Sequence, residues 1–152
     1  MITSATEAVE YLGRRLPEGA SCAVFCEPYE VNVEAETSNL LDVLRLLKAD
    51  EELALDWYSQ AFGIDRGEHF EVVHHLQSTQ TKLEVFVRVK VERAEPVCPS
   101  AVELFKGADW HEREIHDMFG IEFEGHPDLR VILLPEGFVG HPLRKDWKPL
   151  PG

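Results

Sequence analysis

Residues 69–92 read HFEVVHHLQSTQTKLEVFVRVKVE, and two kinds of side chain alternate through both halves of this stretch. One set of alternate positions is mostly apolar: Phe70, Val72, His74, Leu76, Leu83, Val85, Val87, Val89 and Val91. A period of two is typical of a strand with one buried face, and the short polar turn at 78–81 joins two such strands. We therefore predict an antiparallel hairpin with one face packed on helices and the other in water.

The residues on either side of this hairpin predict further strands and helices. The expected elements are a helix over 6–15, strands over 21–26 and 29–36, a helix capped by Ser38 and ending near Ala49, a strand over 53–60, a turn-rich loop at 63–67 and a short helix over 100–105. Hairpins rather than βαβ repeats favour a two-layer α+β domain with a mainly antiparallel sheet of about five strands packed by helices. We place this domain at residues 1–119 and an extended C-terminal interaction arm at residues 120–152.

The composition is that of a globular protein with an excess of acidic side chains. The chain has 152 residues, of which 44% are hydrophobic and 28% charged, and its formal net charge is -13. That charge argues against nucleic acid as a partner and against direct contact with an anionic membrane surface. The apolar runs are too short to span a membrane, and the N-terminus lacks the features of a signal peptide. We therefore expect a cytoplasmic protein.

The three cysteines, Cys22, Cys26 and Cys98, include no CxxC pair. Cys22 and Cys26 lie in one predicted strand, too far apart along it for a relaxed disulfide. Three thiols alone also cannot ligate a four-cysteine cluster. We expect all three cysteines to be reduced and buried.

A second informative stretch, WHEREIHDMFGIEFEGHPDLR at residues 110–130, is dense in charged and aromatic side chains. It predicts a helix with Asp109 as its N-cap and Gly120 just beyond its C-terminus. The stripe expected to be buried contains His111, Ile115, Met118 and Phe119.

The remaining side chains of this predicted helix allow two interpretations. Two pairs have the spacing of helix ion pairs: Arg113 with Asp117, and Glu112 with His116. A different face carries Trp110, Arg113, Glu114 and Asp117. A tryptophan beside charged groups is typical of a protein interface, and it also occurs on a solvated face with one half-buried ring. Both interpretations stay open on the residues alone.

The C-terminal segment is predicted to be an extended arm. Four prolines rule out a long helix there: Pro135, Pro142, Pro149 and Pro151. The arm also carries apolar side chains that need a surface to lie on: Phe138, Val139, Leu143 and Trp147. Two similar sequences, GHPDLR at 125–130 and GHPLR at 140–144, are either coincident turns or anchoring corners. We favour corners in which Arg130 and Arg144 bind carboxylates or carbonyls.

The motifs for catalysis are weak. Residues 111–116 read HExxxH, one residue longer than the HExxH of zinc proteases. That spacing turns the two rings about 140° apart on a helix, so we expect no metal site there. The enzyme alternative is a small acidic hydrolase that uses Glu112, Glu114 or Asp117 with His116. We favour an interaction subunit with no catalytic residue of its own.

The sequences EREIHDMFGIEFEGHPDLRVIL at 112–133 and GHPLRKDW at 140–147 resemble the signature of a known family. They are similar to the 30 kDa subunit, also called the C subunit, of respiratory complex I. Relatives occur in chloroplast and cyanobacterial NDH complexes, in dehydrogenases of reduced coenzyme F420 and in membrane-bound hydrogenases. The resemblance is specific over 110–147 and looser over the hairpin and residues 98–105. His116 departs from it, because the family usually carries an aromatic residue such as tyrosine there.

This resemblance implies a structural and assembly subunit of a proton-translocating NADH:quinone oxidoreductase. Such subunits hold no flavin, iron–sulfur cluster or quinone, which belong to partner subunits. They clasp the large hydrogenase-like subunit that lines the quinone cavity and contact the small iron–sulfur subunit. They lie on the cytoplasmic face of the membrane, which they contact only through the complex. The alternative is the equivalent subunit of a membrane-bound hydrogenase, of a reduced-F420 dehydrogenase or of a ferredoxin-linked complex.

The resemblance also assigns residues. Gly125, Pro127 and Leu129 shape the corner, and residues 140–147 form the arm. The predicted partner interface contains Trp110, Glu112, Arg113, Glu114, Asp117, His126, Arg130, His141, Arg144, Lys145 and Trp147.

Overall fold

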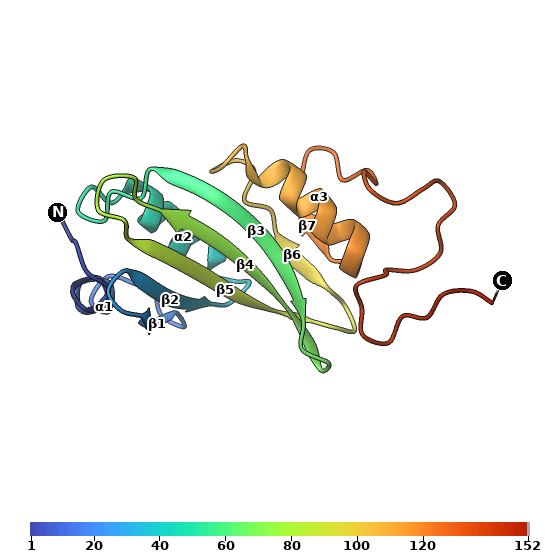
Figure 1. Cartoon of the computed structure of the whole chain (residues 1–152), viewed down its shortest axis with the longest axis horizontal. Helices are drawn as coiled ribbons and strands as arrows, with labels where there is room; N and C mark the ends of the chain where they lie inside the picture. The colour runs from blue at the N-terminus through green and yellow to red at the C-terminus, as the bar shows by residue number, and fades with distance from the viewer. Residues whose placement is uncertain (152) are drawn as a thin grey trace.

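The computed structural model describes residues 1–151 as a sheet covered by helices, with a long C-terminal arm (Figure 1). The elements are α1 (Ala5–Leu12), β1 (Ser21–Cys26), β2 (Glu30–Ala35), α2 (Leu40–Ala49), β3 (Trp57–Asp65), β4 (His69–Gln77), β5 (Glu84–Glu92), β6 (Val97–Pro99), α3 (Ala108–Phe119) and β7 (Glu122–Glu124). Figure 1 shows the arm leaving the α3 end of the sheet, opposite the N-terminus.

The main sheet has five strands in the order β1-β2-β5-β4-β3. The predicted hairpin is confirmed: β4 and β5 pair antiparallel, with Val72 opposite Val89. The pairs β1–β2 and β3–β4 are also antiparallel, whereas β2 and β5 are parallel. The mainly antiparallel α+β fold is therefore as predicted. The parallel pair joins strands far apart in sequence, so no local pattern indicates it. A separate two-stranded sheet pairs β6 with β7.

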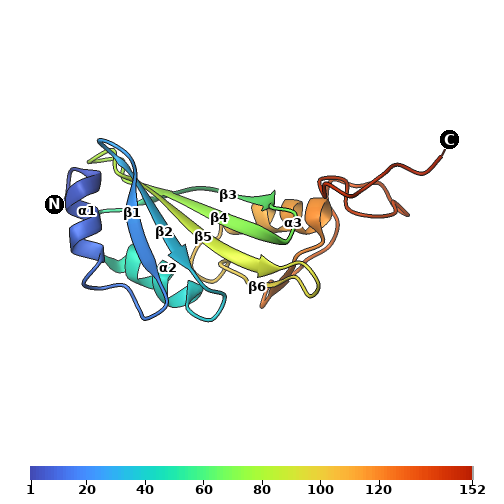
Figure 2. The same ribbon diagram turned by 90° about the horizontal axis from the view of Figure 1, so that it is seen from below.

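One face of the main sheet holds the core. The alternating apolar residues of β2, β4 and β5 form a single cluster with the buried faces of the helices. Helix α2 supplies Leu40, Val43, Leu44 and Leu47, all fully buried. Helix α3 closes the other end, where Phe119 packs edge-on against Phe70 with 6.0 Å between ring centroids. Figure 2 shows α1 and α2 together on one side of the sheet.

The opposite face of the main sheet is less exposed to solvent than the alternation predicts. Val73 is fully buried there, and the His75 ring stacks on Phe86 with 4.2 Å between centroids. Phe25 of β1 adds a further ring 5.8 Å from Phe86. Aromatic side chains from neighbouring strands thus cover part of the outer face.

Strand β3 corrects two predicted boundaries. It begins at Trp57 rather than at Leu53, and it continues to Asp65, through the predicted turn-rich loop. Gly63 accounts for the second error, because a Cβ there would lie 2.7 Å from the ring of Phe119. This glycine provides room for α3 against the strand rather than a turn.

The predicted helix starts are wrong by one or two residues, and one predicted helix is absent. Helix α2 begins at Leu40, and Asn39 rather than Ser38 holds the N-cap position. Asp109 lies inside the first turn of α3 rather than at its cap. Residues 102–104 form a turn instead of a helix. Gly120 ends α3 in the left-handed region, with φ at 75°, as predicted.

The cysteines differ in exposure. Cys98 is buried, Cys22 is half-buried and Cys26 is exposed, and all three are free. The expectation of burial is wrong for Cys26 because β1 is an edge strand with little covering it.

Candidate functional site

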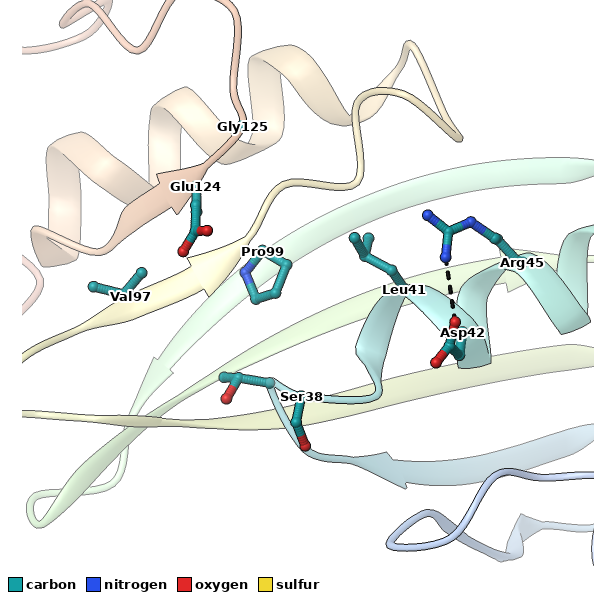
Figure 3. Close-up of a pocket in the computed structure, with 9 residues that line it drawn as sticks. Ser38, Leu41, Asp42, Arg45, Val97, Pro99, Glu124 and Gly125 are labelled. Atoms are coloured by element: carbon teal, nitrogen blue, oxygen red, sulfur yellow. Dashed lines mark hydrogen bonds and ion pairs between the residues drawn. The ribbon is translucent and has the colours of Figure 1, made fainter.

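A pocket of about 640 Å³ lies between the N-terminal turns of α2 and the small β6–β7 sheet (Figure 3). Its charged residues on α2 neutralise each other, since Arg45 pairs with Asp42 at 3.2 Å. None of its lining residues has a buried polar atom without a partner in the part of the chain that the structure describes. The pocket therefore gives no indication of which ligand it could bind, and the candidate site lies elsewhere.

Glu112 lies inside the fold, although it was predicted at an interface. Its side chain is fully buried, and its two oxygens accept from the Ser100 hydroxyl at 2.7 Å and from the Ala101 N–H at 2.6 Å. Burial raises the pKa of this carboxyl to about 7, although the two hydrogen bonds oppose the shift. Glu112 therefore ties α3 to the turn after β6 and is no part of an exposed surface.

Asp117 is 1% exposed and holds the beginning of the arm. Its Oδ2 accepts from the backbone N–H groups of Ile132 at 2.9 Å and Leu133 at 2.8 Å. Its Oδ1 is buried and has no hydrogen-bond partner among residues 1–151. The predicted ion pairs Arg113–Asp117 and Glu112–His116 do not form within residues 1–151, because backbone donors bind both carboxylates instead.

The first GHP sequence makes a corner that its own chain anchors. The His126 side chain is fully buried, with Nε2 3.0 Å from Asp109 Oδ1 and Nδ1 accepting from the Asp128 N–H at 3.0 Å. Arg130 forms the predicted fork, but it binds Asp128 with Nε and Nη2 at 2.8 and 2.6 Å. The Arg130 side chain stays 81% exposed, so it remains accessible to a partner.

The second GHP sequence caps the C-terminus of α3. His141 Nδ1 donates to the Asp117 carbonyl at 3.0 Å, and the Leu143 N–H donates to the Met118 carbonyl at 3.1 Å. Arg144 Nε donates to the Phe119 carbonyl at 2.6 Å. The last carbonyls of a helix have no partners within it, and cations are favoured near them. The arm supplies both the donors and a positive charge.

A further contact fixes the arm to the sheet through Asp65. The Asp65 carboxylate accepts from the Lys145 N–H at 2.8 Å and pairs with Arg93 at 2.7 Å. Arg93 also pairs with Asp146 of the arm at 2.8 Å. Burial acts to raise the pKa of Asp65, but these donors outweigh it and lower the pKa to about 2. We call Asp65, Arg93, Lys145 and Asp146 the arm latch.

Although polar contacts fix the arm, many of its apolar side chains remain exposed. Trp110 on α3 is 64% exposed, and the guanidinium of Arg113 lies 5.3 Å from its ring. Arg113 also donates to the Arg130 carbonyl at 3.1 Å, which joins α3 to the arm. We call the following residues the exposed apolar set: Trp110, Val131, Leu133, Phe138, Val139 and Leu143. Exposed apolar side chains gathered on one segment are typical of an interaction site.

The predicted interface residues therefore differ in their exposure. Trp110, Glu114, Arg130 and Lys145 are exposed; Arg113, His141, Arg144 and Trp147 are half-buried; Glu112, Asp117 and the His126 side chain are buried. Asp65 and Arg93 were not predicted, since nothing in their local sequence indicates contact with residues 145 and 146. Val131 and Leu133 were also absent from the predicted interface, although both are apolar and close to a predicted corner.

The residues proposed for a hydrolase do not assemble. His116 Nδ1 lies 2.9 Å from the Ile121 carbonyl, and no hydrogen bond within residues 1–151 joins His116 to Glu112, Glu114 or Asp117. A general base must lie within hydrogen-bond distance of the group that it activates.

Among residues 1–151, no helix is long and apolar enough to span a membrane.

Comparisons with known proteins agree on one family. A family model described as "Respiratory-chain NADH dehydrogenase, 30 Kd subunit" matches residues 33–151. The C 1 subunit of NADH-quinone oxidoreductase from Rhizobium meliloti (strain 1021) is 45% identical over 126 residues, which are 81% of this chain and 62% of that protein. The chain thus spans about three fifths of the length of such relatives.

Solved structures show the same fold. The trypsin-resistant fragment of Nqo5 superposes with a TM-score of 0.67 and 28% identity, over 82% of this chain and 99% of that one. A chain of the membrane-bound sulfane sulfur reductase, an archaeal respiratory membrane complex, gives a TM-score of 0.74 with 22% identity. That superposition covers 85% of this chain and 75% of the other, and it concerns the fold alone.

Proposed function

The chain belongs to the family of the respiratory-chain NADH dehydrogenase 30 kDa subunit, as its sequence signature predicts, and from this premise we propose a function. It serves as the 30 kDa-type subunit of a complex I type NADH-quinone oxidoreductase. Helix α3 and the arm clasp the large hydrogenase-like subunit at the quinone cavity and contact the small iron–sulfur subunit. The chain lies on the cytoplasmic face and contacts the membrane only through the complex.

The exposed apolar set is the observation that supports this proposal most directly. Hydrogen bonds from His141 and Arg144 to α3 and the arm latch hold the arm in this conformation. Its apolar side chains, Val139 and Leu143 among them, remain available. A segment already held in its bound shape loses less conformational entropy when it docks. The arm therefore has the properties of a preorganised docking element.

In the proposed role the subunit fixes the geometry of its neighbours and carries no flavin, iron–sulfur cluster or quinone. The cysteines support this part of the proposal. Cys98 is buried in β6, whereas Cys22 and Cys26 lie on the distant edge strand β1. Iron–sulfur clusters are usually held by four thiolates that converge on one point.

Single substitutions in the exposed apolar set test the docking role. Trp110→Ala and Val139→Asp should lower recovery of the large subunit about tenfold when tagged chain is purified from native membranes at low salt. Trp57→Ala is the matched control, because Trp57 on β3 is 56% exposed but lies outside the set. Undiminished recovery with both Trp110→Ala and Val139→Asp would count against docking through this surface. Deletion of 140–152 is less informative, since it also removes the cap of α3.

An equivalent subunit of a related respiratory complex is the second candidate. The fold likeness to the archaeal complex favours keeping it. Identification of the proteins that co-purify with the chain separates the two, because an NADH-oxidising complex contains subunits that a hydrogenase or reductase lacks.

A further inference from the structure

A second pocket, about 570 Å³ in volume, lies between α3 and the first half of the arm. Its lining includes His116 and Asp117 of α3 and Val131, Glu136, Phe138 and His141 of the arm. The walls combine apolar side chains with two carboxylates and two imidazoles. Unlike the pocket beside α2, its lining includes a residue with a buried oxygen that has no partner in the described part of the chain, Oδ1 of Asp117.

The hydrogen bonds around the pocket determine which polar atoms remain free. Nδ1 of His116 faces the Ile121 carbonyl at 2.9 Å, and Nδ1 of His141 faces the Asp117 carbonyl at 3.0 Å. A carbonyl oxygen only accepts, so each Nδ1 donates to its carbonyl. Oδ1 of Asp117 has no partner within residues 1–151 and Glu136 is exposed, so two carboxylate acceptors remain available in the lining.

A ligand that binds these two carboxylates must donate hydrogen bonds, and a positive charge on it is favoured. The guanidinium group of arginine is planar and has five N–H donors, is more weakly hydrated than an ammonium group and binds carboxylates well. Phe138 lies in the same wall, and an aromatic ring attracts a cation placed over its face. Arginine is also enriched at the energetic centres of protein interfaces.

We infer that this pocket receives an arginine side chain of the neighbouring subunit, whose guanidinium group donates to Oδ1 of Asp117. The inference rests on the proposed docking function and specifies the chemistry of the partner. Asp117 then has two roles: Oδ2 holds the backbone of Ile132 and Leu133, and Oδ1 binds the partner. The partner contact and the shape of the arm are thus joined through one carboxylate.

The first test measures partner binding by the full chain. Asp117→Asn keeps an oxygen for the two backbone donors but places an NH₂ group where the guanidinium would donate. We expect at least about tenfold weaker binding to the purified partner subunits and faster dissociation. Glu10→Gln is the matched control, because Glu10 is an exposed carboxylate on α1, outside the pocket and outside the predicted partner interface. It should change the affinity by less than about threefold.

The second test uses the wild-type chain, so it does not depend on how Asp117→Asn folds. Methylguanidinium should shift the NMR signals of the Ile132 and Leu133 amides in a saturable way. Methylammonium, a cation of another shape, and methylurea, a neutral molecule of similar shape, should not. Equal shifts with methylammonium, or no saturable shift with methylguanidinium, would overturn the inference; the second result would mean that water alone satisfies Oδ1.

The two proposals fail in different ways. If Trp110→Ala weakens partner binding while Asp117→Asn does not, docking stands and the arginine contact is wrong. If Trp110→Ala, Val139→Asp and Asp117→Asn all leave binding unchanged, the docking surface itself is wrong.

Discussion

Replacing Glu112 by glutamine should remove a large part of the pH dependence of stability. In the folded chain, burial raises the pKa of the Glu112 carboxyl from 4.5 to about 7. A raised pKa means that the folded state binds the proton more tightly than the unfolded state does. The stabilisation is fully present below pH 4.5 and is lost as the pH rises through 7. Glutamine resembles the protonated form at every pH.

The magnitude follows from the two pKa values. A shift of one unit corresponds to about 1.4 kcal/mol, so between pH 5.5 and 8 the Glu112 carboxyl should destabilise the wild type by about 2 kcal/mol. Glutamine should keep both hydrogen bonds, since Oε1 accepts from the Ala101 N–H and Nε2 donates to the Ser100 hydroxyl. The range starts at pH 5.5 because solubility is lowest near the isoelectric point of about 4.9.

Urea unfolding of both proteins, followed by circular dichroism at several pH values, measures the effect. Other titrating groups, such as His74, whose pKa burial lowers to about 4, are present in both proteins and cancel in the difference. Glu114→Gln, at an exposed position on the same helix, should give a pH profile parallel to the wild type. Parallel profiles for wild type and Glu112→Gln would refute the reasoning, because they would show that Glu112 stays ionised in the fold.

Three further substitutions test the packing of α3 and the arm latch, with Gly107→Ala as the control for Gly63→Ala. Gly63→Ala should destabilise the fold by about 1–3 kcal/mol in urea, because the added Cβ would lie 2.7 Å from the Phe119 ring. Gly107→Ala should change stability by less than about 0.5 kcal/mol, since its Cβ would meet Tyr58 at an ordinary 3.6 Å. Asp65→Asn should speed trypsin cleavage after Lys145 several-fold, because the neutral amide weakens the contacts to Arg93 and to the Lys145 N–H. An unchanged cleavage rate would show that the latch does not hold the arm.

The sequence predicts the sheet better than it predicts the site, because the strands depend on residues close together in the sequence and the site depends on residues far apart in it. Alternation along β4 and β5 is a local property, so the hairpin follows from neighbouring residues. Gly63 was misread as a turn residue because its conformational freedom is visible in sequence and the nearby Phe119 ring is not.

The site depends on contacts between distant residues. Glu112 and Asp117 appear in sequence as charges on a helix surface, and only their contacts with residues 100–101 and 132–133 show that both are buried. Asp65 lies 28 positions from Arg93 and 80 from Lys145, so no periodic pattern reveals their contact. The family signature located the right segment, but it did not distinguish residues that shape the segment from residues that face outward.

The cap on α3 has a consequence for assembly. Because the carbonyls of Asp117, Met118 and Phe119 bind donors from residues 141–144, fraying of the last helical turn and detachment of the arm are one local unfolding event. A neighbour that binds the arm therefore also slows the opening of the helix end. Because Phe119 lies against Gly63 of β3, it also slows the opening of the adjoining edge of the sheet. Amide hydrogen exchange in the last turn of α3 and in the arm should therefore change together when a partner binds. Protection of the helix end from exchange then shows whether the arm is bound to α3.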